Sequence, residues 1–84
     1  MQLHILKDSS NNEARAIIAS LADKNCDSVR VVLILDGRNM RPDWKCKTYW
    51  LNEEGETLAP AGIEVINMDR LVDLISEADS VVPW

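Results

Sequence analysis

The hydrophobic pattern of the chain is centred on a short run, residues 31–35, that is apolar at every position. It follows Val29 and stops at Asp36-Gly37. A run this short and this rich in β-branched residues favours a strand that is buried on both faces of a sheet. Asp-Gly favours a turn, because Gly tolerates positive φ and Asp bonds to nearby backbone. Since such a strand needs helices above and below it, we expect an α/β layered domain.

Two segments have the periodicity of amphipathic helices. The first begins after Ser10 and Glu13, which fit an S-x-x-E capping box, and is expected to end near Asn25. The second follows Asn67, a suitable N-cap. The apolar face of the first helix is predicted at Ala14, Ile17, Ile18, Leu21 and Ala22, and that of the second at Met68, Leu71, Val72 and Ile75.

Four other segments have strand composition: residues 2–7, 46–51, 63–66 and 80–84. Pro83 cannot donate to a sheet ladder, so it indicates either that the last strand lies at an edge or that the strand ends there. Residues 38–47 read as a loop with at most one helical turn, and a short helix is possible over 53–58.

The predicted order is β-α-β-loop-β-(short helix)-β-α-β, in a single domain over residues 1–84. Alternation of this kind favours a small, mostly parallel sheet of about five strands with helices on both faces. A chain of 84 residues buries only about 60–65% of its unfolded surface, so association with another chain would add stability.

Charge and composition exclude several function classes. A net charge of −5 opposes direct binding to nucleic acid, which needs cationic surface. No apolar run reaches the ~18 residues of a membrane span and no signal pattern is present, so a cytoplasmic location is expected. One histidine and two cysteines without a CxxC spacing predict neither a metal site nor a cofactor.

Ligands of parallel sheets bind beyond the carboxyl ends of the strands. Three polar segments follow predicted strands and are therefore expected at that edge: residues 36–38, 7–10 and 52–53. Cys26 precedes the second predicted strand and Cys46 begins the third, so both are expected at the opposite edge.

The two cysteines are the candidates for nucleophilic chemistry. Cys46 lies between Lys45 and Lys47, which would favour a thiolate, but side chains alternate along a strand and the lysines would point to the other face. Cys26 follows a helix C-terminus, whose dipole opposes a thiolate. Packing roles are favoured for both, and a structural role is favoured for the lone histidine, His4.

Basic residues next to a tryptophan provide the candidates for partner binding. Arg38, Arg41 and Lys45 lie close to Trp44 in the predicted loop, and Lys47 follows them. They could form a docking patch for an acidic partner or an anion, or an ordinary solvated loop. Trp84 ends the predicted edge strand and is a further candidate, because Trp is enriched at interfaces.

Several short motifs occur in order along nearly the whole chain. They are Leu3-His-Ile-Leu6 followed by Lys7-Asp-Ser9, the apolar run that ends in Asp36-Gly37, Tyr49-Trp-Leu-Asn-Glu53, Ile63-Glu-Val-Ile-Asn-Met-Asp-Arg-Leu-Val-Asp-Leu74, and Asp79-Ser-Val-Val-Pro-Trp84. Their order and spacing resemble the DsrH/TusB group of the DsrE-like sulfur-relay superfamily.

The resemblance implies a DsrE-like fold and a small subunit that associates with itself or with DsrE- and DsrF-like (TusD- and TusC-like) subunits. Such complexes pass persulfide sulfur between proteins, either to the wobble uridine of tRNA for 2-thiolation or in dissimilatory sulfur oxidation. The catalytic paralogue carries its cysteine near the end of the third strand, where this chain has Leu51-Asn52. Some DsrH-type members carry one in the first helix, whereas Cys26 follows that helix.

The resulting expectation is a structural or docking subunit rather than a sulfur carrier. Two alternatives remain open from the sequence. One is a persulfide-carrying sulfurtransferase that uses Cys46 or Cys26, and the other is a homo-oligomeric binding module unrelated to sulfur.

Overall fold

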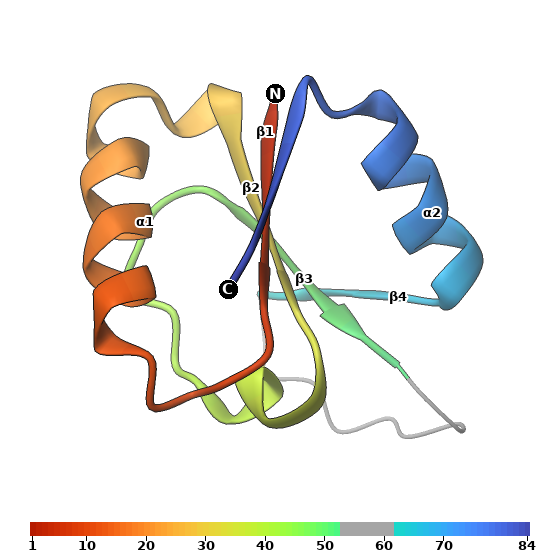
Figure 1. Ribbon diagram of the computed structural model, residues 1–84, viewed down its shortest axis with the longest axis horizontal. Helices are drawn as coiled ribbons and strands as arrows, with labels where there is room; N and C mark the ends of the chain where they lie inside the picture. Colours follow the sequence, from red (N-terminus) through yellow and green to blue (C-terminus); the bar gives the residue numbers. More distant parts are fainter. Residues whose placement is uncertain (53–61) are drawn as a thin grey trace.

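The computed structural model describes residues 1–52 and 62–84 (Figure 1). Its five strands all run parallel in one sheet, in the order β4-β3-β2-β1-β5. They are β1 (Gln2–Leu6), β2 (Val29–Leu33), β3 (Lys47–Leu51), β4 (Glu64–Ile66) and β5 (Ser80–Pro83). The helices are α1 (Asn12–Asn25) and α2 (Met68–Glu77), with short 3₁₀ turns at Cys26–Ser28 and Leu35–Asn39. A small α/β fold with a parallel sheet is therefore confirmed, and β5 lies at an edge, one of the two alternatives that Pro83 left open.

The two α-helices cover opposite faces of the sheet (Figure 1). Parallel crossovers are almost always right-handed. The connection from β1 to β2 moves along the sheet in one direction, and the connection from β4 to β5 moves across it in the other. Right-handed crossovers in opposite directions place their helices on opposite faces, so the strand order explains the two layers.

Each face of the sheet has its own hydrophobic core. The α1 face is built on Leu6, Ile18, Val31 and Leu33, and the α2 face on Leu3, Val32, Leu51 and Leu74. Val31, Val32 and Leu33 of β2 are all fully buried, which confirms the predicted strand that is covered on both faces.

The connection from β2 to β3 contains no α-helix. Residues 40–46, here called the crossover segment, cover the α1 face of β3 instead. Met40 and Trp44 are buried there, and Trp44 Nε1 donates a hydrogen bond of 2.8 Å to Thr48 Oγ1. An ion pair of 3.1 Å between Arg15 and Asp43 joins the crossover segment to α1. Two large side chains, Met40 and Trp44, thus cover the part of the sheet that a crossover helix would otherwise cover.

The N-cap of α1 was predicted one residue too early. The cap is Asn11, whose side chain accepts a hydrogen bond of 3.0 Å from the backbone N–H of Ala14. Ser10 Oγ donates instead to Asp8 Oδ1, at 2.7 Å. A carboxylate two residues before Ser10 engages its hydroxyl, which leaves the capping position to the next polar side chain. The cap of α2 is Asn67, as predicted, and it accepts from the Arg70 N–H.

The central strand ends at Leu33, earlier than the apolar run suggested. Leu35 is exposed and has φ of +49°, a left-handed conformation that is costly for a side chain with a Cβ. Gly37 follows in the 3₁₀ turn. An added Cβ at Gly37 would lie 2.0 Å from the carbonyl oxygen of Leu6, so close backbone approach, and not positive φ, requires glycine here.

The apolar face of α2 was predicted wrongly in part. Leu71 and Leu74 are buried against the sheet. Met68, Val72 and Ile75 are 54%, 55% and 41% exposed. The arc of apolar residues on α2 is wider than the surface that the sheet can cover, so one half of it faces outward. Neither described helix has the length and apolar character to cross a membrane.

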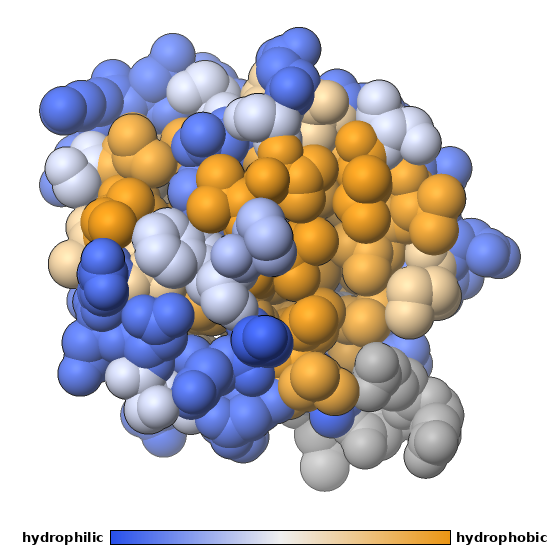
Figure 2. Space-filling model, in the orientation of Figure 1, coloured by the Kyte–Doolittle hydropathy of each residue, from blue (hydrophilic) through white to orange (hydrophobic). Residues whose placement is uncertain are grey.

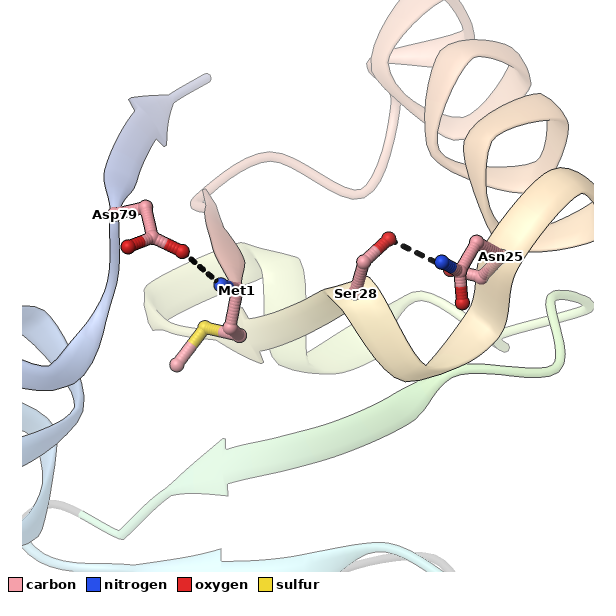
Figure 3. Close-up of polar contacts among 4 residues, drawn as sticks. All are labelled: Met1, Asn25, Ser28 and Asp79. Atoms are coloured by element: carbon pink, nitrogen blue, oxygen red, sulfur yellow. Dashed lines mark hydrogen bonds and ion pairs between the residues drawn. The ribbon is translucent and has the colours of Figure 1, made fainter.

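Polar contacts tie the amino edge of the sheet together (Figure 3). The amino group of Met1 forms an ion pair with Asp79, just before β5, and the Asp79 N–H donates to the Met1 carbonyl at 2.8 Å. This amino group lowers the pKa of the Asp79 carboxyl by hydrogen bonding and by its charge. Ser28 Oγ donates to the Asn25 carbonyl at 3.0 Å, which closes the turn after α1. The helix considered over residues 53–58 lies outside the described residues.

Candidate functional site

The carboxyl edge of the sheet brings together some of the residues that were expected there, whereas Glu53 lies outside the described residues. The backbone N–H and the hydroxyl of Ser9 both donate to Asp36 Oδ2, at 3.0 and 2.8 Å, and Asn39 Nδ2 donates to Asp36 Oδ1 at 2.9 Å. The hydrogen bond from Asn39, followed by those from Ser9, lowers the pKa of Asp36. Asp36 therefore joins the loop after β1 to the 3₁₀ turn after β2.

A second carboxylate at this edge is also occupied. Asp8 accepts hydrogen bonds from the hydroxyl and the backbone N–H of Ser10, which lower the pKa of Asp8. Within residues 1–52 and 62–84, no group of three acidic, histidine or cysteine side chains is arranged to hold a metal ion. The polar groups of the carboxyl edge form hydrogen bonds mainly with one another. This pattern indicates that they hold the loops of this edge together.

Arg38 belongs to the same edge and is held by the fold. Its Nε donates to the Leu35 carbonyl at 3.1 Å, and Nη1 donates to the Leu51 carbonyl at 3.4 Å. Its guanidinium lies 5.2 Å from the centre of the Trp50 ring. The contacts with Leu35 and Leu51 join the turn after β2 to the end of β3. Arg38 lines neither of the two hollows that contain the other members of the predicted docking patch.

A cavity of about 580 Å³ lies at the opposite, amino edge, beside β3 and the start of β4. It is lined by Arg41, Pro42, Trp44, Cys46, Lys47, Thr48, Gly62 and Ile63. Four predicted candidates therefore do meet, namely Arg41, Trp44, Cys46 and Lys47. Lys47 forms an ion pair of 3.1 Å with Glu64 of β4. The cavity has the volume of a small-molecule site, with an apolar wall and cations at its rim.

Cys46 is buried in the wall of this cavity. Burial raises the pKa of the Cys46 thiol to about 11, mainly because the thiolate would lose its hydration. At neutral pH the residue is therefore a thiol, which is a weak nucleophile and a poor sulfur acceptor. Its position suits the packing role that the sequence favoured.

Alkylation should separate the two cysteines. With a pKa of about 11, only about one Cys46 side chain in a thousand is a thiolate at pH 8, and burial limits access further. We expect iodoacetamide to label exposed Cys26 in the native protein and Cys46 only after unfolding, as measured by peptide mass mapping. Rapid native labelling of Cys46 in a Cys26→Ser variant would show that the cavity admits reagent and supports a thiolate.

Cys26 lies in a second, smaller hollow at the amino edge, about 210 Å³ in volume. Three cationic side chains, Arg30, Lys45 and Lys47, line the same hollow. Cys26 Sγ also lies 3.9 Å from Asp27 Oδ1, where the thiol can donate to the carboxylate. Lys45, predicted as part of the docking patch, thus lies near Cys26 and does not line the cavity of Cys46.

Trp84 and His4 form a contact that the sequence did not predict. Trp84 Nε1 donates to His4 Nδ1 at 2.9 Å, and His4 Nε2 lies 2.8 Å from Gln2 Oε1. The rings of His4 and Trp84 are nearly parallel, at 12°, with centres 6.2 Å apart. These contacts require a neutral imidazole that carries its proton on Nε2. The Trp84 backbone N–H also donates to the Ile5 carbonyl, so Trp84 extends the contact between β5 and β1.

This contact predicts a pH-dependent stability. Burial lowers the pKa of His4 from its ordinary value of 6.5, so the folded state favours the neutral ring. The stabilisation is complete above about pH 6.5 and is lost as the pH falls from there through the lowered pKa, because the unfolded chain then binds the proton more tightly.

Urea unfolding between pH 7.5 and 5 measures the effect, and His4→Asn provides the control. The asparagine amide oxygen can accept from Trp84 Nε1 but does not titrate in this range. The loss of stability toward pH 5 should be smaller in the variant than in the wild type. If the free energy of unfolding depended on pH in the same way in both proteins, the loss of stability toward pH 5 would belong to groups other than His4.

Only part of this site was accessible to sequence reasoning. Arg41, Trp44 and Cys46 are neighbours in sequence, and their proximity followed from that. Gly62 and Ile63, which complete the cavity, gave no signal, since they reach it through the pairing of β4 with β3. The His4 and Trp84 pair joins residues 80 positions apart, and only their aromatic, hydrogen-bonding character in two strands hinted at it.

Comparison with known proteins adds no identification. No model of a known protein family matches this chain, and a search of curated proteins finds no significant match.

Proposed function

We propose that this chain is a docking subunit of a sulfur-relay complex, and that it completes an oligomer without carrying sulfur itself. The complex would serve 2-thiolation of the tRNA wobble uridine or dissimilatory sulfur oxidation. Its partners would be DsrE- and DsrF-like (TusD- and TusC-like) subunits or further copies of the chain. The proposal begins from the ordered motifs that resemble the DsrH/TusB group and that span nearly the whole sequence.

The observation that carries the non-catalytic role is the state of Cys46. A persulfide carrier needs an accessible thiolate that can attack a sulfur donor and then present the outer sulfur to an acceptor. Cys46 is buried and its pKa is raised to about 11. The carboxyl end of β3 has Leu51-Asn52, so no thiol stands where the catalytic paralogue has one.

A persulfide assay tests the proposal. The protein is incubated with a cysteine desulfurase, cysteine and pyridoxal phosphate, and its intact mass is compared with that of Cys26→Ser and Cys46→Ser variants. We expect no stable gain of a sulfur atom in any of the three, while a known acceptor in the same mixture becomes loaded. Co-expression with DsrE- and DsrF-like subunits should give a complex that elutes as one species.

Each alternative predicts a different result. A sulfur gain that is lost in one variant only would identify a carrier and its residue. The cationic hollow around Cys26 favours that residue over Cys46 as the carrier, because positive charge attracts an anionic sulfur. Failure to gain sulfur together with failure to bind either subunit would leave a binding module unrelated to sulfur.

A further inference from the structure

The exposed half of α2 carries three exposed large apolar side chains that the site above does not use. Met68, Val72 and Ile75 lie on one side of the helix, and we call them the α2 stripe; each is more than two-fifths exposed. Figure 2 shows apolar side chains gathered over α2 and the adjoining edge of the sheet at β5. Val81 of β5 adds a further 36%-exposed residue on the α2 face.

The stripe has a charged flank. With 3.6 residues per turn, Asp69 and Asp73 fall beside the stripe, on the side away from the buried Leu71 and Leu74. Both carboxylates are exposed, and no hydrogen bond or ion pair is found for either within the described part of the chain. Arg70, the one basic residue of α2, forms an ion pair of 3.6 Å with Glu77. The uncompensated charge beside the stripe is therefore negative.

We propose that the α2 stripe docks a basic amphipathic helix of a partner protein. Apolar residues of that helix would cover Met68, Val72 and Ile75, and its lysines or arginines would face Asp69 and Asp73. The inference rests on the docking role proposed above and names the surface and the partner chemistry for it.

Charge disfavours a second copy as the occupant. Two chains of net charge −5 repel each other, and an antiparallel α2–α2 contact would bring the acidic flank of one copy against that of the other. The area of the apolar patch also disfavours a second copy as the occupant. Four partly exposed residues make a patch on the scale of roughly 300–600 Å², below the roughly 800 Å² per partner of a stable dimer. A single helix lying on the stripe matches this extent.

A labelled peptide tests the surface directly. The probe is a fluorescein-labelled, helix-forming peptide with leucines at helical spacing and lysines beside them, titrated with the full chain and followed by fluorescence anisotropy. We expect saturable binding that weakens with salt. A matched peptide with glutamate in place of each lysine should not bind.

Variants locate the binding. Val72→Ser should weaken it about tenfold, whereas Ile17→Ser, which removes a 38%-exposed apolar residue from α1, should leave it unchanged. Asp69→Asn with Asp73→Asn should weaken binding about threefold to fivefold and flatten its salt dependence. Glu13→Gln with Asp23→Asn removes the same charge from α1 and is the control.

Three outcomes would overturn the proposal: equal binding of both peptides, equal loss in the α1 and α2 variants, or dimerisation of the protein alone that Val72→Ser abolishes in sedimentation. The last outcome would make a second copy the occupant. This titration uses neither desulfurase nor relay subunits. Its failure therefore leaves the sulfur-relay role to be judged by the persulfide assay, and the reverse also holds.

Discussion

Gly37→Ala is expected to lower the free energy of unfolding by at least about 4 kcal/mol. The added Cβ would lie 2.0 Å from the Leu6 carbonyl oxygen and 2.7 Å from its carbon. That carbonyl accepts a hydrogen bond of 3.0 Å from the Ile34 N–H, so it cannot move away without weakening this hydrogen bond. The Gly37 N–H is itself bonded to the Ile34 carbonyl at 2.8 Å. Two backbone segments are thus fixed against each other at this point.

Urea unfolding followed by circular dichroism measures this effect, with Gly62→Ala as the matched control. Gly62 has φ of +86° but open space around its Cα, so its substitution should cost only about 1–2 kcal/mol of backbone strain. A domain of this length has a total stability of roughly 4–13 kcal/mol. A Gly37→Ala chain that does not fold, beside a folded Gly62→Ala chain, therefore agrees with the prediction. Similar stability of the two variants contradicts it.

Trp44→Ala is expected to lower the free energy of unfolding by about 3–5 kcal/mol, the range for removal of a buried tryptophan. Trp44 is only 8% exposed and stands where a crossover helix would otherwise cover the α1 face of β3. Its loss would enlarge the adjoining cavity and uncover Cys46 in the same wall. Native alkylation of Cys46 should therefore become faster in this variant, which a thermal or urea midpoint alone would not reveal.

Trp44→Phe separates the packing of the ring from its hydrogen bond. Phenylalanine retains most of the apolar contact but loses the 2.8 Å bond to Thr48 Oγ1, so a cost of about 1 kcal/mol is expected. Thr48 still donates to the Cys46 carbonyl at 3.2 Å, which limits the penalty. If Trp44→Ala were no more destabilising than Trp44→Phe, the crossover segment would not be part of the core.

The candidate site was predictable where it depends on neighbours in sequence. Arg41, Trp44 and Cys46 meet because they occupy one short segment, and Ser9 meets Asp36 because parallel strands end at a common edge. Arg38 was predicted to join the docking patch, but its aromatic partner turned out to be Trp50, which belongs to β3. Lys45 and Arg41 in turn line different hollows at the amino edge.

The sequence by itself determined the secondary structure that depends on local periodicity and capping. The β-branched run of β2, the spacing of apolar residues in α1 and the Asn67 cap of α2 are local features, because their energetics depend on residues within a few positions. Together with the alternation of strands and helices they were enough to indicate a parallel α/β sheet.

Only the tertiary structure decided the order of the strands, and with it the faces that the helices cover. The order places β1 between β2 and β5, sends α2 across the opposite face from α1, and brings Trp84 to His4. It also requires glycine at position 37, because the turn after β2 approaches the end of β1, and it leaves half of the α2 apolar arc uncovered. These features depend on pairing between segments that are distant in the sequence. The free energy of that pairing depends on contacts throughout the fold, so no single stretch of the chain predicts it.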